Sequence, residues 1–265
     1  MKVRILAVLF ALCILFAGCE AGKPSTTENT PNPQASSYEV ISTAMENTGK
    51  LNAINLEMQM DVSVSVAGQT IDVPMAVVCK AKNVNTDTPI IQTNTSASVM
   101  GQKSTVEMYQ EGNWAYISTQ GQNFKMDVSD GNPYDQLGSS QNIMMDLPEE
   151  LLKGLSMSQN SDGSQTVTIT IPNDTFESIY GDLLKSINST SSAGTATSVS
   201  VKDATVKITV NKGYVVEYSM NFEMDMTVSG YDANSRVTAS VKFIDPGMDV
   251  VITPPEGYQN YPTMN

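Results

Sequence analysis

The stretch "LEMQMDVSVSV", Leu56–Val66, decides the fold of this chain. Its even-numbered positions are apolar and its odd-numbered positions are polar or charged, without a break. A two-residue period of this length predicts a β-strand with one apolar and one hydrated face. The stretch "YSMNFEMDMTV", Tyr218–Val228, has the same pattern. Either an old duplication or a shared physical demand explains the similarity, and we favour the second because no fixed repeat runs through the chain.

Further segments have strand composition and are separated by turn sequences. The predicted strands are residues 75–82, 90–99, 104–109, 114–118, 166–171, 205–210 and 236–243, and the turns are "VAGQ", "MGQK", "QEGN", "SDGS", "NKGY" and "YDANS". The stretch "EMYQEGNWAYIS" predicts a hairpin with Gly112 in its turn. Connections this short favour antiparallel neighbours.

Helical periodicity is confined to three places. "SYEVISTAMENTGK" predicts a helix that begins after Ser36 or Ser37 and stops at Gly49. "NDTFESIYGDLLKSI" and "DLPEELLKGL" predict two more, and residues 188–198 are predicted as a flexible loop. A sheet of nine or more strands usually curls. We therefore expect an α+β fold, a large curved antiparallel sheet forming an open half-barrel, with a few helices packed on its concave face.

The N-terminus is predicted to be a targeting segment. Lys2 and Arg4 precede an apolar run over residues 5–17, which as a helix spans about 20 Å and is too short to cross a bilayer. Residues 1–18 therefore resemble a signal peptide. Ala17, Gly18 and Cys19 resemble the lipobox of bacterial lipoproteins, which implies lipidation of Cys19. The alternative is an ordinary cleaved signal peptide with an incidental cysteine.

The next residues, 19–37, are rich in Pro, Ser, Thr and Asn and are predicted to be a disordered tether. Residues 38–265 are predicted to form a single domain. Loss of residues 1–18 would change the formal net charge from −13 to −15, because it removes two basic residues and no acidic one. Such a surface repels nucleic acid and anionic headgroups, so we expect the lipid to supply the membrane attachment.

Several motifs together resemble one family. The lipobox, the tether, a first helix leading into a Met-rich strand, the hairpin "VEMYQEGNWAYIS" and the closing "VKFIDPGMDVVITPPEGY" are similar to lipoproteins of the LolA and LppX type, including Gram-positive lipoproteins of unknown function. The resemblance covers residues 37–258. It implies an open half-barrel with helices as a lid, and some members carry lipids or lipid-bearing proteins in the hollow. It transfers no catalytic motif.

The chain contains 16 methionines, several of them on predicted apolar strand faces. Methionine is flexible, so these residues could form a deformable surface that contacts lipid. Rows of methionine more often belong to an ordinary hydrophobic core, and we favour that interpretation. Trp114 either lines a ligand opening or packs across its hairpin, and we favour packing. The candidate residues for a hydrophobic ligand are Leu56, Met58, Met60, Val62, Trp114, Tyr116, Phe176, Ile179, Leu183, Tyr218, Met220, Phe222, Met224 and Met226.

The sequence gives little support for a catalytic or metal-binding site. The chain has no histidine, no Gly-x-Ser-x-Gly and no Ser-x-x-Lys, and Cys79 is most simply a core residue. The acidic residues at positions 57, 61, 223 and 225 fit a hydrated strand face better than a hydrolase pair. The segment Asp127–Asp135 resembles a calcium loop only loosely, because the twelfth position is Gly138. We therefore expect no enzyme activity, no metal and no cofactor.

The sequence favours a non-enzymatic lipoprotein on the outer face of the cell membrane, held by lipid on Cys19, that binds or carries a lipid or a lipid-bearing protein. A structural or sensory envelope lipoprotein with a packed interior, acting through protein contacts, is the alternative. A carboxylate-based hydrolase is a distant third hypothesis.

Overall fold

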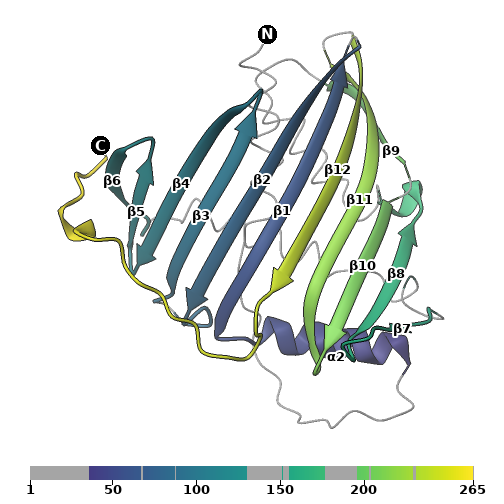
Figure 1. The fold of residues 1–265 in the computed structure, drawn as a ribbon, viewed down its shortest axis with the longest axis horizontal. Coiled ribbons are helices and arrows are strands. Elements are labelled where there is room, and N and C mark those ends of the chain that lie inside the picture. The colour runs from purple at the N-terminus through teal and green to yellow at the C-terminus, as the bar shows by residue number, and fades with distance from the viewer. Residues whose placement is uncertain are drawn as a thin grey trace.

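The structure is a computed structural model that describes residues 36–66, 68–86, 88–129, 151, 155–176, 196–202, 204–228 and 231–264. One antiparallel sheet of 12 strands dominates it (Figure 1). The strand order is β6-β5-β4-β3-β2-β1-β12-β11-β10-β8-β7, and β9 pairs with β11 beyond β10. The prediction of a large open antiparallel sheet with few helices is confirmed.

The strands are β1 (Ala53–Val66), β2 (Gln69–Lys82), β3 (Ile90–Val99), β4 (Gln102–Glu111), β5 (Trp114–Thr119), β6 (Gln122–Asp127), β7 (Ser158–Gln159), β8 (Gln165–Ile171), β9 (Ala196–Val201), β10 (Ala204–Asn211), β11 (Tyr214–Val228) and β12 (Tyr231–Phe243). The first six form an antiparallel meander in chain order. The sheet is joined in its middle, where β1 pairs with β12 from Leu56↔Phe243 to Val66↔Ala233.

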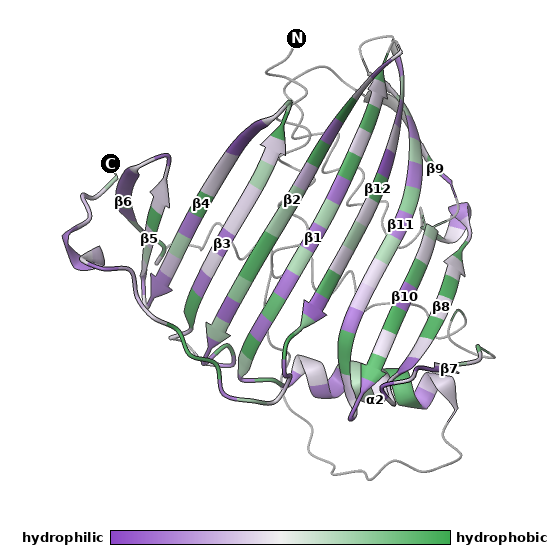
Figure 2. Cartoon of the chain, viewed as in Figure 1, coloured by the Kyte–Doolittle hydropathy of each residue, from purple (hydrophilic) through white to green (hydrophobic). Residues whose placement is uncertain are grey.

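The sheet has two chemically different faces. We call the face that carries Leu56, Met58 and Met60 the inner face, and the opposite one the outer face. Met60 pairs with Met75 on β2 and with Ala239 on β12, so the apolar positions of neighbouring strands share the inner face. Figure 2 shows the resulting alternation of hydrophobic and hydrophilic bands along the central strands. The main buried cluster lies on this inner face.

Helix α2 (Ser37–Gly49) contacts β10 and β11, and its buried Ile41 and Ala44 belong to the inner-face cluster (Figure 1). Ser36 caps the helix in a capping box with Glu39, which fixes where it begins. The predicted first helix is therefore confirmed. Among the described residues, no helix is long and apolar enough to cross a membrane.

Two sequence predictions are wrong in detail. "YDANS" was predicted to be a turn, but it opens β12, where Asn234 donates a hydrogen bond of 2.8 Å to Asp225 on β11. Residues 196–198 of the predicted loop belong to β9. Within residues 232–235 of β12 the only apolar side chain is that of Ala233, so no alternation marks this segment as a strand.

Two strands were not predicted, and two predicted helices are only partly described. Strands β6 and β7 are short, with six and two residues, so each carries little pattern. Residues 173–176 and Leu151 are helical, as expected, whereas Leu155, the last residue of the helix predicted over 146–155, is not helical. The other residues of the helices predicted over 173–187 and 146–155 lie outside the described residues.

The C-terminal segment crosses the outer face from the end of β12 to β6 (Figure 1). It contains a 3₁₀ helix, η1 (Tyr258–Asn260). Tyr258 packs edge-on against Tyr109 and Tyr116, with ring centroids 5.1 and 4.7 Å apart, respectively. Backbone hydrogen bonds of 2.8 Å then join Lys125 on β6 to residues 262 and 264. The tail therefore occupies backbone groups of a strand that would otherwise be a free sheet edge.

Thr48 ties α2 to the sheet. Its buried hydroxyl donates to the carbonyl of Ala44 at 2.7 Å and accepts from the N–H of Val215 at 2.9 Å. We expect Thr48→Val to lower the free energy of unfolding by about 1–3 kcal/mol, because it leaves a buried N–H without an acceptor. Urea unfolding followed by circular dichroism measures the change. Thr43→Val on the exposed side of the same helix is the matched control, and an equal loss there would contradict the assignment.

Candidate functional site

The candidate site is the inner face of the four central strands. Its side chains come from alternate positions: Ile54–Val64 on β1, Ile71–Ala81 on β2, Tyr218–Met226 on β11 and Ala233–Phe243 on β12. Within these described positions none is charged. The charged residues of the same strands, among them Glu57, Asp61 and Lys242, occupy the intervening outer-face positions. Strand alternation alone therefore produces a wide uncharged apolar surface.

A single cross-strand row shows how this surface is built. The registers place Met75, Met60, Ala239 and Met220 side by side on β2, β1, β12 and β11. Val206 on β10 and Ile169 on β8 continue the row. The small side chain of Ala239 thus lies between two flexible thioether chains. Methionine changes rotamer at low cost, so this row can adjust its shape more easily than a row of branched side chains.

Burial is not uniform along the inner face. Met60, Met224 and Met58 are only 2%, 3% and 4% exposed. Towards the ends of β1 and β2 that lie away from α2, inner-face residues of the same cluster are only partly buried; they are Val64, Ile71, Ala97, Val99 and Met226. The site is thus an apolar surface that is deeply buried in its middle and only partly buried at one end, which we call the open end.

Within the part of the chain that the structure describes, few polar contacts hold α2 over this surface. Besides Thr48, Asn47 Nδ2 donates to the carbonyl of Gly213 at 2.9 Å, near the C-terminal end of the helix. At its N-terminal end, Ser37 Oγ donates to the carbonyl of Leu155 at 2.5 Å. Between these points the helix presents apolar side chains to the sheet. Its position therefore depends mainly on apolar packing, which is non-directional and tolerates small shifts.

The structure divides the residues predicted to bind a hydrophobic ligand into three groups. The inner-face group holds Leu56, Met58, Met60, Val62, Phe176, Tyr218, Met220, Phe222, Met224 and Met226. Phe176 joins it from outside the sheet, with its ring centroid 5.3 Å from that of Phe222. Trp114 and Tyr116 lie on the outer face, because Ala115 and Ile117 take the inner positions of β5. Ile179 and Leu183 lie outside the described residues.

Trp114 and Tyr116 have structural contacts on the outer face. The Lys125 ammonium lies 5.3 Å from the Trp114 ring centroid, and Tyr116 packs against the tail residue Tyr258. Desolvation raises the pKa of neighbouring Tyr109 above its ordinary value, and the Glu111 carboxylate adds to the effect. This corner is therefore a packed aromatic cluster beneath the tail, separate from the apolar surface of the inner face.

The sequence analysis missed the contribution of β2. Val73, Met75 and Val77 lie on the inner face next to β1, but Ala76 and Val78 at the intervening positions blur the two-residue period. Cys79 is buried at 5% exposure in the same row of positions. These residues could have been found from the short connection between β1 and β2. The turn at Gly68 fixes the register of the hairpin, and the register determines which β2 residues lie beside Met58 and Met60.

Outside the inner face the described residues contain no group of three or more acidic, cysteine or histidine residues placed to hold a metal. A backbone hydrogen bond from Ser129 lowers the pKa of Asp127, as in an ordinary turn. In the "SDGS" hairpin the hydroxyl of Ser164 donates a hydrogen bond to Asp162 and lowers the pKa of that carboxyl, and the Ser164 backbone N–H adds to the effect. The rest of the Asp127–Asp135 segment lies outside the described residues.

The chain belongs to a family of unknown function, DUF6612, whose model matches residues 36–245. A comparison with curated proteins finds no match. Among solved structures, LprF from Mycobacterium bovis has a TM-score of 0.41 at 12% identity, with 86% of this chain and 100% of that one covered.

Two further solved structures are similar to this chain. A DUF1329 family protein from Desulfovibrio piger has a TM-score of 0.27 at 7% identity, covering 80% of this chain and 93% of that one. A putative outer membrane lipoprotein-sorting protein domain from Vibrio parahaemolyticus has a TM-score of 0.20 at 11% identity, covering 79% and 93%. All three scores are below 0.5, so function is argued below from the geometry of this chain alone.

Met60 lies at the centre of the inner-face row and is 2% exposed. We expect Met60→Ala to lower the free energy of unfolding by about 2–5 kcal/mol, through lost apolar burial and the cavity left behind. Chemical denaturation measures it. Gln59→Ala, one residue away on the outer face, is the matched control and should change stability by less than about 0.5 kcal/mol. Similar losses for both variants would contradict the assignment of faces.

Proposed function

We propose that this protein is a non-enzymatic extracytoplasmic lipoprotein that binds or carries a hydrophobic ligand, a lipid or a lipid-bearing protein, against the inner face of its sheet. The observation that carries the proposal is the uncharged apolar surface across four long strands, which is only partly buried at the open end. Sites that bind small hydrophobic ligands are lined mainly by apolar side chains.

The chemistry of the surface suits an acyl chain. It offers thioether and branched side chains, and it has no charged inner position in the described parts of β1, β2, β11 and β12. Each CH₂ group moved from water to such a surface gains about 0.8 kcal/mol. A chain of ordinary length therefore needs no specific polar contact for its apolar part. The methionines allow the wall to adapt to chains that differ in length or branching.

Access is proposed to occur at the open end. Val64, Ile71 and Val99 are partly buried there, whereas the residues nearer α2 are deeply covered. Because α2 is held by apolar packing and a few terminal hydrogen bonds, a small shift of the helix would admit a ligand deeper into the cluster. Ligand binding would then replace contacts of the helix with contacts of similar chemistry, so the exchange need cost little free energy.

Membrane attachment is a separate part of the proposal. Its support is the lipobox-like sequence ending at Cys19, followed by a polar tract that connects to Ser36 at the start of the described chain. Lipid on Cys19 would hold the sheet domain close to a source of acyl chains. The acidic composition of the chain makes attachment through anionic headgroups unfavourable.

The second candidate function is a structural or sensory envelope lipoprotein with a packed interior. One observation favours it: the central methionines Met58, Met60, Met220 and Met224 are packed among protein side chains and are only 2–5% exposed. In this case the inner face would form only the hydrophobic core, and the protein would act through surface contacts with a partner protein. The two candidates differ in whether the protein retains lipid.

The lipid proposal is tested on residues 36–265 secreted from a bacterial host. Mass spectrometry of organic extracts should find co-purified lipid, and a fluorescent fatty acid should bind. Val64→Asp at the open end should weaken fatty-acid binding at least about tenfold, because it places a charge on the apolar surface. Ser65→Asp, the next residue on the outer face, is the matched control. Absence of both extracted lipid and fatty-acid uptake would contradict the proposal and favour the packed alternative.

The anchor is tested by Cys19→Ala in the full chain. Without an acylated cysteine we expect the protein to move from the membrane fraction to the soluble fraction, because the acyl chains supply the binding free energy. Immunoblots of separated fractions measure the distribution. Cys79→Ala is the matched control, since this thiol is buried in the sheet. Membrane association that is unchanged in Cys19→Ala would refute the anchor and leave the lipid-binding proposal standing.

A further inference from the structure

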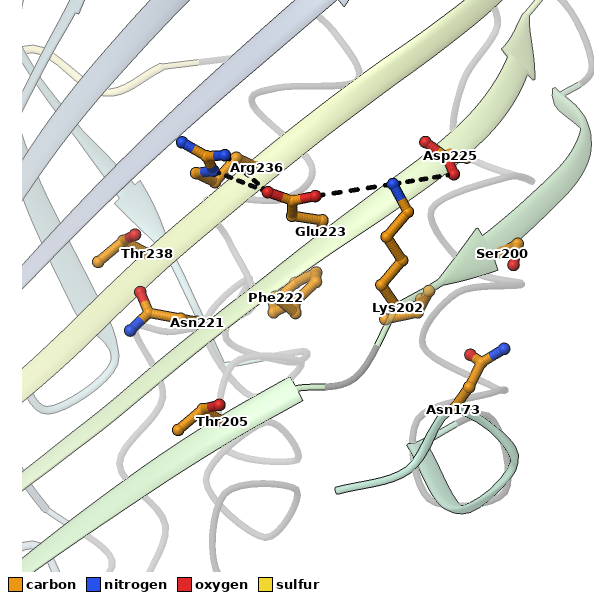
Figure 3. Close-up of a pocket in the computed structure, with 11 residues that line it drawn as sticks. Asn173, Ser200, Lys202, Thr205, Asn221, Phe222, Glu223, Asp225, Arg236 and Thr238 are labelled. Carbon is orange, nitrogen blue, oxygen red and sulfur yellow. Dashed lines mark hydrogen bonds and ion pairs between the residues drawn. The ribbon is translucent and has the colours of Figure 1, made fainter. Parts of the chain in front are cut away.

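A polar groove lies on the outer face, over β11, β12 and the junction of β9 with β10 (Figure 3). Its volume is about 830 Å³. Glu223 and Asp225 on β11 and Arg236 and Thr238 on β12 point away from the inner-face core, as the register requires. The polar side chains of the groove therefore lie on the face opposite the apolar surface described above, and the groove meets that surface only at Val201 and Phe222.

A step in the sheet creates the groove. Thr205 on β10 pairs with Asn221, and Val201 on β9 pairs with Met224. Three residues therefore lie between Val201 and Thr205, whereas only two lie between their partners on β11. The chain next to Lys202 thus carries one residue more than the β11 segment opposite it. Strand β8 ends at Ile171, which pairs with Ala204, and Asn173 follows beyond Pro172. The extra residue brings Lys202 over the outer face, where its backbone N–H donates 2.8 Å to the carbonyl of Glu223.

Among the described residues that line the groove, the positive and negative charges neutralise one another. Arg236 donates to Glu223 with an Nη2–Oε1 distance of 2.7 Å. Lys202 Nζ lies between the two carboxylates, 3.6 Å from Glu223 and 3.3 Å from Asp225 (Figure 3). The hydrogen bond from Arg236 lowers the pKa of Glu223, and that from Asn234 lowers the pKa of Asp225. Two cations therefore face two carboxylates that stay ionised at neutral pH.

The ion pairs among these four residues limit the chemical class of ligand that the groove can bind. An anion would have to compete with Glu223 and Asp225 for the two basic groups, and a cation would meet carboxylates that are already paired. The carboxylates stay ionised, which is unsuited to a general acid. Five of the remaining lining residues offer hydroxyl or amide groups, which both donate and accept, and the other two, Val201 and Phe222, are apolar. The five polar residues are Thr205, Thr238, Ser200, Asn221 and Asn173. A neutral ligand rich in hydroxyl groups matches this set.

Asn173 adds an independent observation. Its Oδ1 is buried and has no hydrogen-bond partner. A buried acceptor without a donor is unfavourable, and such atoms are uncommon in folded proteins. A ligand hydroxyl at this end of the groove, reached by rotation of the side chain, would satisfy it. We propose that the outer-face groove formed by Asn221, Thr238, Thr205, Lys202 and Asn173 binds an uncharged carbohydrate chain.

The test uses the full chain, purified in a detergent without a sugar headgroup. Calorimetric titration with chitotetraose, cellotetraose and maltotetraose, each up to about 10 mM, should detect binding of at least one of them. Asn221→Ala and Thr238→Val, which face each other across β11 and β12, should each weaken that binding several-fold, and the double variant about tenfold or more, because each removes hydrogen bonds to the ligand.

Ser219→Ala is the matched control, since Ser219 lies two residues from Asn221 on the same face but outside the groove. Its affinity should equal that of the unmodified chain, and thermal unfolding should confirm that all variants fold. No binding of any of the three oligosaccharides would overturn the proposal, as would an equal loss in Ser219→Ala. Displacement of the bound sugar by inorganic phosphate would overturn it too, because it would indicate an anion site. Fatty-acid binding is unaffected by these outcomes, so failure here leaves the proposed function intact.

Discussion

The structure depends on the phase of side-chain alternation being the same in neighbouring strands. Met75, Met60, Ala239 and Met220 form one row only because the β2–β1, β1–β12 and β12–β11 registers all keep apolar positions on one face. A slip of one residue at any of these ladders would turn a whole strand's apolar set towards water. The docking of α2, the uncharged inner surface and the polar outer groove all follow from this shared phase.

Much of the fold follows from local pattern, and the exceptions have physical causes. The unbroken alternation at 56–66 and 218–228 and the cap of α2 were sufficient to predict those elements. β6 and β9 were missed because each has only six residues, so its polar–apolar alternation is too short to stand out from a loop. The inner-face residues of β1 and β11 were identified from parity. For Trp114 the sequence left two roles open, ligand lining and hairpin packing, because residue type alone does not say which face a hairpin residue occupies. The contribution of β2 could be seen only from the register of its pairing with β1.

Strand β11 contributes side chains to both the inner and the outer face of the sheet. Met220, Phe222 and Met224 belong to the buried side, while Asn221, Glu223 and Asp225 belong to the groove on the other side. Phe222 also borders the groove while its ring packs 5.3 Å from Phe176. Two binding surfaces of opposite chemistry can therefore share one strand, because successive side chains alternate between its faces. A single extra residue near Lys202 is enough to hollow the polar side.

The central position of the β1–β12 ladder has a consequence for biogenesis. β1 lies near the start of the chain and β12 lies near residue 240, so the contact that unites both halves of the sheet spans almost the whole domain. A polypeptide delivered N-terminus first keeps one edge of β1 unpaired, with its apolar side uncovered, until the last long strand emerges. Sequence-distant pairing of this kind is slow to form and prone to association with other chains. Such a chain would benefit from a holding factor during its maturation.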